Sequence, residues 1–290
     1  MKRLLPCSFA AACMLRAFAA VDPAQLAAAH ALFDQAGKSA EAQKAFETIA
    51  AADSQNAEAQ NFLAQLALRR DDAGQALAHA EKAAALAPDN ADIQDTLGDA
   101  YGRSAQKAGL FSQLGFAKKS LAAYQRAVAL APANVNFHQS LFDYYRQAPG
   151  IAGGGTDKAL GEAAIIKQLD PVRGRLAFAT LYVADKKFDQ ALAEFDEVLK
   201  TSPDNYAALY QVGRLAAISG QFLDRGLASL RHCLELKPGE NDPAHAAAQW
   251  RMGNILEKKN DPTGARAAYA AALKLDPKFT QAADASKKLK

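Results

Sequence analysis

Small and bulky residues follow a fixed order over residues 246–277. With Ala246 counted as position 1, bulky side chains occupy positions 7, 11 and 24 and small ones occupy positions 8, 20 and 27; these residues are Met252, Leu256, Tyr269, Gly253, Ala265 and Ala272. Small residues let two antiparallel helices approach closely, and the bulky ones fill the space that remains. The stretch therefore predicts a pair of packed helices, and Pro277 predicts where the second helix ends.

A similar order recurs upstream, and a proline or a serine marks the end of each unit. The unit ends are Ser54, Pro88, Pro132, Pro171, Pro203, Pro238 and Pro277. The intervals between them are 34, 44, 39, 32, 35 and 39 residues, so the pattern predicts seven helix pairs over residues 23–277. Asparagine follows four of these ends by two residues and is expected to cap the next helix, at Asn56, Asn90, Asn134 and Asn205.

The third unit repeats the order closely, with Leu97, Gly98, Tyr101, Tyr124 and Ala127 at positions 7, 8, 11, 24 and 27. This match of size class and spacing resembles the tetratricopeptide repeat. The resemblance implies an all-α, right-handed superhelical solenoid of about seven helix hairpins over residues 21–277, followed by a capping helix over residues 278–290. Apolar residues recur at helical spacing within the extra residues 105–115, so this insertion is expected to lengthen the third hairpin.

A glycine-rich segment, PGIAGGG at residues 149–155, interrupts the fourth unit. Pro149 is expected to end one helix, and Thr156 with Asp157 to begin the next. A phosphate-binding loop needs lysine and then serine or threonine after its last glycine, and this chain has Thr156 and Asp157 there. The segment therefore predicts a hairpin connector, with anion binding by the backbone N–H groups at the start of the following helix as the alternative. Together the two insertions resemble a group of exported bacterial repeat proteins.

The first residues have the pattern of an export signal. Lys2 and Arg3 form a basic start, residues 4–15 are largely apolar, and residues 17–19 read Ala-Phe-Ala. The apolar run is too short to cross a bilayer. We therefore expect a signal peptide over residues 1–20 and a periplasmic or secreted protein, with a lipid anchor through Cys13 as the alternative.

Composition and charge narrow the class of protein further. Half of the residues are hydrophobic, and alanine is far commoner than β-branched or aromatic residues, which favours close-packed helices over sheets. The net charge is +3, and no basic block with interleaved aromatics is present, so nucleic acid is not an expected partner. After removal of a signal, Cys233 would be the last thiol, and its place at position 27 predicts a buried, inert core residue.

The sequence holds no recognisable catalytic or metal-binding constellation. The five histidines show no i, i+4 pair, and neither a Cys-x-x-Cys nor a Gly-x-Ser-x-Gly pattern occurs. Asp92, Asp95 and Asp99 form an acidic stripe on one helix face, for which a solvated surface is expected and a basic peptide or a metal ion are the alternatives. The chain is therefore expected to be a non-enzymatic protein without cofactor or metal.

In the tetratricopeptide repeat family, positions 2, 5, 9 and 12 of each first helix line a concave groove. The resemblance thus implies a peptide-binding groove that includes Arg175, Phe178, Tyr182, Tyr210, Arg214, Trp250, Asn254, Asp92, Asp95 and Asp99. The same mapping adds Glu58, Asn61, Gln65, Gln139, Asp143 and Arg146. Position 5 carries no lysine, so the family's clamp for a C-terminal carboxylate is not supported. Tyr210 and Trp250 have a second interpretation, in which they cover neighbouring repeats.

These expectations combine into one hypothesis and one alternative. The hypothesis is an exported, non-enzymatic adaptor that binds a peptide or protein in its groove, since aromatic and arginine side chains dominate binding hot spots. The alternative is a receptor for a small molecule or glycan that stacks on the groove aromatics. An enzyme would need a site that the sequence does not show.

Overall fold

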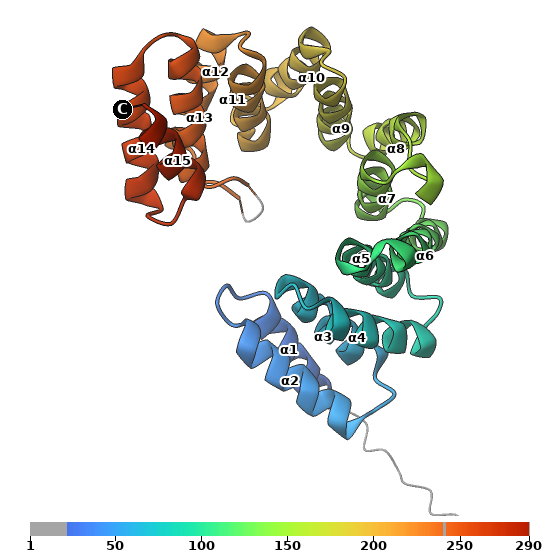
Figure 1. The fold of residues 1–290 in the computed structure, drawn as a ribbon. Helices are drawn as coiled ribbons and strands as arrows, with labels where there is room; N and C mark the ends of the chain where they lie inside the picture. Colours follow the sequence, from blue (N-terminus) through green and yellow to red (C-terminus); the bar gives the residue numbers. More distant parts are fainter. Residues whose placement is uncertain (1–21, 240–241, 290) are drawn as a thin grey trace, which may run out of the picture. The chain divides into compact units, whose positions relative to one another are not determined.

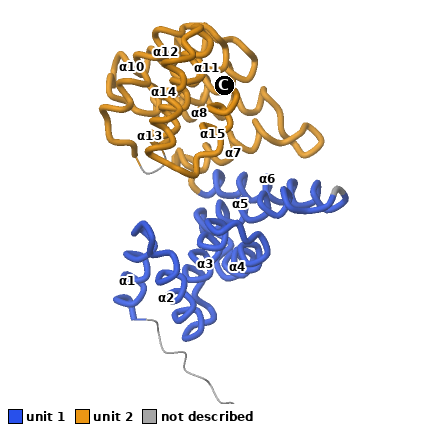
Figure 2. The backbone as a smooth tube through the Cα atoms, turned by 60° about the vertical axis from the view of Figure 1, so that its left-hand side comes forward, with its two compact units in different colours: residues 1–130 blue, residues 131–290 orange. Residues whose placement is uncertain are grey.

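The computed structural model describes residues 22–239 and 242–289, and every regular element in this part of the chain is a helix (Figure 1). The all-α fold class is thus confirmed. The expected export signal over residues 1–20, with Cys13, lies outside the described residues. The chain divides into two compact units, residues 1–130 and 131–290 (Figure 2).

The described residues of unit 1 (residues 1–130) form three helix hairpins. Each helix contacts the next one in the chain, and α3 also contacts α5. The helices of this unit are α1 (Pro23–Phe33), α2 (Ser39–Ala52), α3 (Ala57–Arg69), α4 (Ala73–Leu86), α5 (Ala91–Lys107) and α6 (Leu110–Leu130).

In unit 2 (residues 131–290), the part of the chain that the structure describes forms four hairpins and a final helix that packs on α14. Consecutive helices contact each other, and α11 and α13 pack directly. The elements of this unit are α7 (Val135–Gln147), the 3-10 turn η1 (Gly150–Ala152), α8 (Thr156–Leu169), α9 (Pro171–Ala184), α10 (Phe188–Thr201), α11 (Tyr206–Ser219), α12 (Leu223–Glu235), α13 (His245–Lys258), α14 (Pro262–Leu275) and α15 (Thr280–Lys288).

The four asparagines expected as helix caps all act as caps. The side-chain oxygens of Asn56, Asn90, Asn134 and Asn205 accept hydrogen bonds from the backbone N–H groups of Ala59, Ile93, Asn136 and Ala208, at 2.9 to 3.1 Å. The residues that mark the unit ends follow the second helices within three residues. Pro171 differs in its role, because it is the first residue of α9 and Asp170 caps that helix.

A close contact between position 8 and position 24 holds three of the hairpins together. Gly98 faces the ring of Tyr124, Gly213 faces the side chain of Leu230, and Gly253 faces the ring of Tyr269. A Cβ at Gly98 would lie 2.5 Å from the Tyr124 ring, and a Cβ at either of the other glycines would also meet its partner at under 3.0 Å. Any side chain at these positions would therefore push the two helices apart.

The two insertions lie within hairpins. The extra residues 105–115 are mostly helical, and α5 and α6 have 17 and 21 residues. In the second insertion, α7 ends at Gln147 and α8 begins at Thr156, close to the expected bounds. The N-cap of α8 is Gly155, and no side chain caps this helix.

Cys233 is fully buried in the core of α11, α12 and α13, as its repeat position predicted. Burial raises the pKa of its thiol to about 12, so it stays protonated at neutral pH. Among the described residues, no helix combines the length and the apolar character that a membrane crossing requires.

The contact between Gly98 and Tyr124 leads to a stability prediction. Gly98→Ala should lower the free energy of unfolding by about 1–3 kcal/mol, and Gly98→Leu by at least as much, because the new atoms overlap the buried Tyr124 ring. Chemical denaturation followed by circular dichroism measures the change.

Gly115→Ala is the matched control, because Gly115 also lies inside a helix and a Cβ there would meet nothing within 4 Å. It should stabilise by about 0.5–1 kcal/mol through helix propensity alone. Equal effects of the two alanine substitutions would show that the packing assigned to Gly98 is wrong.

Candidate functional site

The groove residues expected in unit 1 lie on α3 and α5, and most of them have partners within the chain. Glu58 pairs with His30 at 3.1 Å between carboxylate oxygen and Nε2. Gln65 Nε2 donates to the hydroxyl of Thr96 at 3.3 Å. Asn61 is buried, so it offers little surface to a ligand.

The three aspartates of the acidic stripe on α5 differ in their surroundings. Asp92 and Asp99 are exposed and Asp95 is half-buried. The carboxyl of Asp99 accepts a hydrogen bond of 2.6 Å from the hydroxyl of the buried Tyr124. Burial of that carboxyl raises the pKa of Asp99, while the Tyr124 bond and the charge of Arg103 oppose the rise. Nowhere in residues 22–239 and 242–289 do three or more His, Cys, Asp or Glu side chains come close enough to hold a metal ion.

The glycine-rich segment uses its backbone donors internally. The N–H groups of Ala152, Gly153, Gly154 and Gly155 donate to backbone carbonyls of Pro149, Gly150, Pro149 and Tyr145. The Tyr144 hydroxyl donates to the carbonyl of Ala152 at 2.8 Å. These contacts fit the connector interpretation. They do not involve the first N–H groups of α8, on which the anion alternative depends, and no side chain caps that helix.

On α9, Arg175 is engaged by acidic residues while the aromatic side chains remain partly open. Arg175 pairs with Glu194 at 2.8 Å and Glu197 at 3.6 Å, both on α10. The rings of Phe178 and Tyr182 are stacked with their centroids 6.4 Å apart, and both residues are half-buried. Phe178 and Tyr182 therefore present aromatic surface on a first helix, whereas Arg175 joins the two helices of its hairpin.

The aromatics of α11 and α13 pack within the fold. Tyr210 is only 6% exposed and belongs to the core shared by α11, α12 and α13. Trp250 is half-buried, and its ring meets that of Phe279 edge-on at 5.7 Å. Asn254 donates to the hydroxyl of Tyr269 at 3.3 Å, and that hydroxyl donates to Glu257. These contacts agree with the second interpretation, in which Tyr210 and Trp250 cover neighbouring repeats.

Arginines also lie on α7, α11 and α13, which are first helices of unit 2, and they differ in their partners. Arg146 on α7 pairs with Asp143 at 2.9 Å, and Gln139 donates to the same carboxylate at 3.0 Å. Arg214 on α11 is half-buried and donates to Gln211 at 3.1 Å. Arg251 on α13 is also half-buried, with its guanidinium carbon 4.1 Å from the centre of the Trp250 ring.

Arg251 is a residue that the sequence analysis missed. It occupies position 6 of its unit, and the groove positions considered were 2, 5, 9 and 12. The sequence could have pointed to Arg251, because it directly follows Trp250 and lies one helical turn before Asn254.

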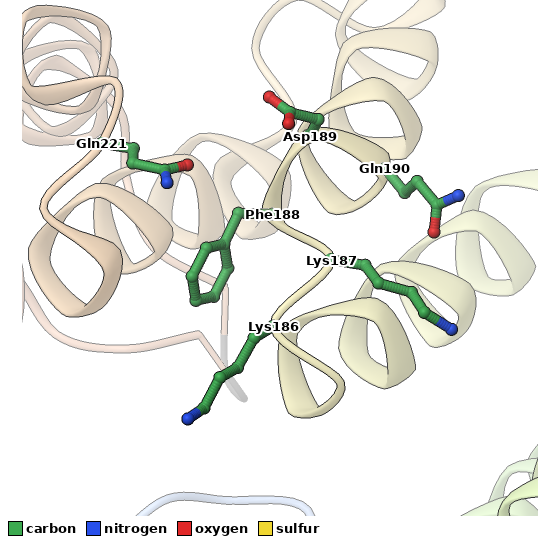
Figure 3. A pocket seen from close by; sticks show the side chains of 6 residues that line it. All are labelled: Lys186, Lys187, Phe188, Asp189, Gln190 and Gln221. Carbon is green, nitrogen blue, oxygen red and sulfur yellow. The ribbon is translucent and has the colours of Figure 1, made fainter.

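A shallow cavity of about 320 Å³ lies at the turn between α9 and α10 (Figure 3). It is lined by Lys186, Lys187, Phe188, Asp189, Gln190 and Gln221. The side chains of Lys186, Lys187 and Asp189 point in different directions and do not converge on one point. This cavity therefore lacks the convergent polar groups of a small-molecule site.

Known proteins support the repeat architecture. Two family models, both described as tetratricopeptide repeat, match the chain, one at residues 246–279 and the other at residues 26–91 and 176–240. Together they cover more than half of the chain. No curated protein shows significant sequence similarity to it.

Solved structures of similar fold include a tetratricopeptide repeat protein from Parabacteroides merdae, with a TM-score of 0.65 and 16% identity over 92% of this chain and 97% of that one. Yeast Tom70 also reaches a TM-score of 0.65 with 16% identity, over 87% of this chain and 51% of its own. A thermophilic repeat protein from Thermus thermophilus has a TM-score of 0.53 and 21% identity, over 73% of this chain and 98% of that one. The repeat order in the sequence, the stacked hairpins and these matches together show that the chain belongs to the tetratricopeptide repeat family.

Proposed function

We propose that this protein is a non-enzymatic adaptor that holds a protein partner on the first-helix surface of unit 2. We define this surface by Arg146, Phe178, Tyr182, Arg214, Trp250 and Arg251, on helices α7, α9, α11 and α13. Tetratricopeptide repeats generally mediate contacts between proteins. The proposal places that general role on one set of side chains.

The observation that carries the proposal is the pair of stacked rings, Phe178 and Tyr182. Both rings are half-buried, so they are held in place and still present apolar area. Rigid aromatic side chains gain contact area for little loss of conformational entropy, which makes them effective anchors for a partner. The ammonium group of Lys167 lies over the Phe178 ring, 5.4 Å from its centre, and places a positive charge next to the stacked pair.

We also propose that the protein is exported and resides in the bacterial cell envelope. This proposal is supported by the basic start at Lys2 and Arg3, the apolar residues 4–15 and the Ala-Phe-Ala sequence at residues 17–19. The partner would then be a protein or peptide of the same compartment.

Affinity capture from an envelope extract tests the binding surface. Phe178→Ala combined with Tyr182→Ala should reduce the yield of the captured partner by about tenfold or more, because two anchor rings are lost. Quantitative mass spectrometry of the captured proteins measures the change.

The matched control is Ile165→Ala combined with Leu275→Ala, which removes two exposed apolar side chains from the second helices α8 and α14. It should leave the capture unchanged. Circular dichroism must show that both variants are folded. If the folded aromatic variant captures the same proteins as the wild type, the surface is misplaced. If a glycan shifts the melting temperature of the wild type but not of the aromatic variant, the receptor alternative is correct.

The export proposal is tested on the mature chain. Mass spectrometry of the protein purified from an envelope fraction should show a chain that begins near residue 21, and Leu5→Asp, within the apolar run, should leave the full-length chain in the cytoplasm. Cys13→Ala separates the two routes, since it would release a lipid-anchored form from the membrane and leave a cleaved form unaffected. A full-length wild-type chain in the cytoplasm would contradict the proposal.

A further inference from the structure

Two half-buried arginines of unit 2 have no acidic partner within the described residues. Arg214 and Arg251 lie on α11 and α13, which pack directly against each other. Neither takes part in an ion pair in residues 22–239 and 242–289. Two other half-buried basic side chains of this unit, Arg175 and Lys167, pair with Glu194. Half-buried Arg173 donates to the side-chain oxygen of Asn136 at 2.7 Å. Arg214 and Arg251 differ from these residues because they lie on two helices that pack together and neither has an acidic partner in the described part of the chain.

The contacts that these arginines do make leave donor groups unused. Arg214 has one hydrogen bond to a side chain, from Nη1 to the Gln211 oxygen at 3.1 Å. Arg251 stacks on Trp250, and its buried Nε has no hydrogen-bond partner among the described atoms. A guanidinium carries five N–H donors, and a buried donor without an acceptor is costly. The other guanidinium N–H groups of the two arginines make no further hydrogen bond within the described residues, so an acceptor from outside the chain can bind them.

Two positive charges, those of Arg251 and Arg146, act on Arg214. Burial lowers the pKa of Arg214, and the charges of Arg251 and Arg146 lower it further, whereas Tyr210 opposes this change. Asp143, which pairs with Arg146 at 2.9 Å, is the carboxylate bound to this group of arginines. An additional anion would therefore be attracted to the space next to Arg214 and Arg251.

We propose that Arg214 and Arg251, together with Arg146, bind the side-chain carboxylates of an acidic peptide segment. The inference rests on the proposed function and names the chemistry of its partner. Arginine suits this role because its planar guanidinium can bind a carboxylate with two parallel hydrogen bonds.

The distribution of the arginines favours several carboxylates over one. The three side chains come from three different helices, α7, α11 and α13. Axes of packed helices lie about 8–10 Å apart, and residues of an extended peptide advance about 3.3 Å each. Acidic side chains two or three residues apart would therefore match Arg214 and Arg251, whose helices α11 and α13 pack directly, whereas a single chain terminus would engage one arginine or two.

A binding assay with a defined probe tests the inference. The probe is a fluorescein-labelled, C-terminally amidated peptide of alternating Glu and Ala, and the same peptide with Gln in place of Glu is its neutral counterpart. Fluorescence anisotropy should show that the acidic peptide binds and the neutral peptide does not, and added salt should weaken the binding. Arg214→Gln and Arg251→Gln should each weaken it about tenfold.

Arg231→Gln is the matched control, because Arg231 is an exposed arginine on the second helix α12 and its loss changes the net charge equally. It should leave the affinity within about twofold of the wild type, as expected for an exposed charge at a distance. Arg214→Lys keeps the charge and should fall between wild type and Arg214→Gln. The melting temperature of each variant establishes that it is folded.

Three results would overturn the inference. They are equal binding of the acidic and neutral peptides, equal losses in Arg214→Gln and Arg231→Gln, and tighter binding of a single-stranded RNA oligonucleotide that depends on the same arginines. The proposed function is judged separately, in the affinity-capture experiment. If Phe178→Ala combined with Tyr182→Ala abolishes capture of the partner while Arg214→Gln retains it, the adaptor proposal stands and the proposal of an acidic partner segment is wrong.

Discussion

The fold depends on one contact within a hairpin, in which a glycine on the first helix touches a bulky side chain on the second. It is present between Gly98 and Tyr124 in unit 1 and between Gly253 and Tyr269 in unit 2. Because the ring rests on the helix backbone, the two helices can approach in one register only. That register decides which side of the first helix is covered by its partner and which side is left for other contacts.

The same contact determines the role of two residues that the repeat pattern assigned to a groove. With its ring against Gly98, Tyr124 places its hydroxyl 2.6 Å from the Asp99 carboxylate. The Tyr269 hydroxyl likewise accepts from Asn254 at 3.3 Å. Asp99 and Asn254 both occupy position 9 and therefore contribute to hairpin stability. Any partner would have to compete with these internal hydrogen bonds.

The sequence predicted those features that depend on a single hairpin. The helix ends, the asparagine caps, the burial of Cys233, the helical character of the insertion at residues 105–115 and the connector at residues 149–155 all follow from local spacing and residue type. Contacts between hairpins were harder to predict. Tyr210 is buried because α13 packs on α11, and Trp250 is partly covered by Phe279, which follows α14. Arg175 is bound by Glu194 from the second helix of its own hairpin. A rule that assigns positions along a first helix contains no information on what the second helix and the next hairpin cover.

A double-mutant cycle between Gly253 and Tyr269 tests the central claim most directly. Gly253→Ala, Tyr269→Leu and the double variant are compared by their free energies of unfolding. If the ring rests on the glycine, the smaller Leu makes room for the new methyl group. The cycle should then show a favourable coupling of about 0.5–3 kcal/mol. If the effects of the two substitutions simply add, Gly253 and Tyr269 are not in contact, and the register on which the account depends is wrong.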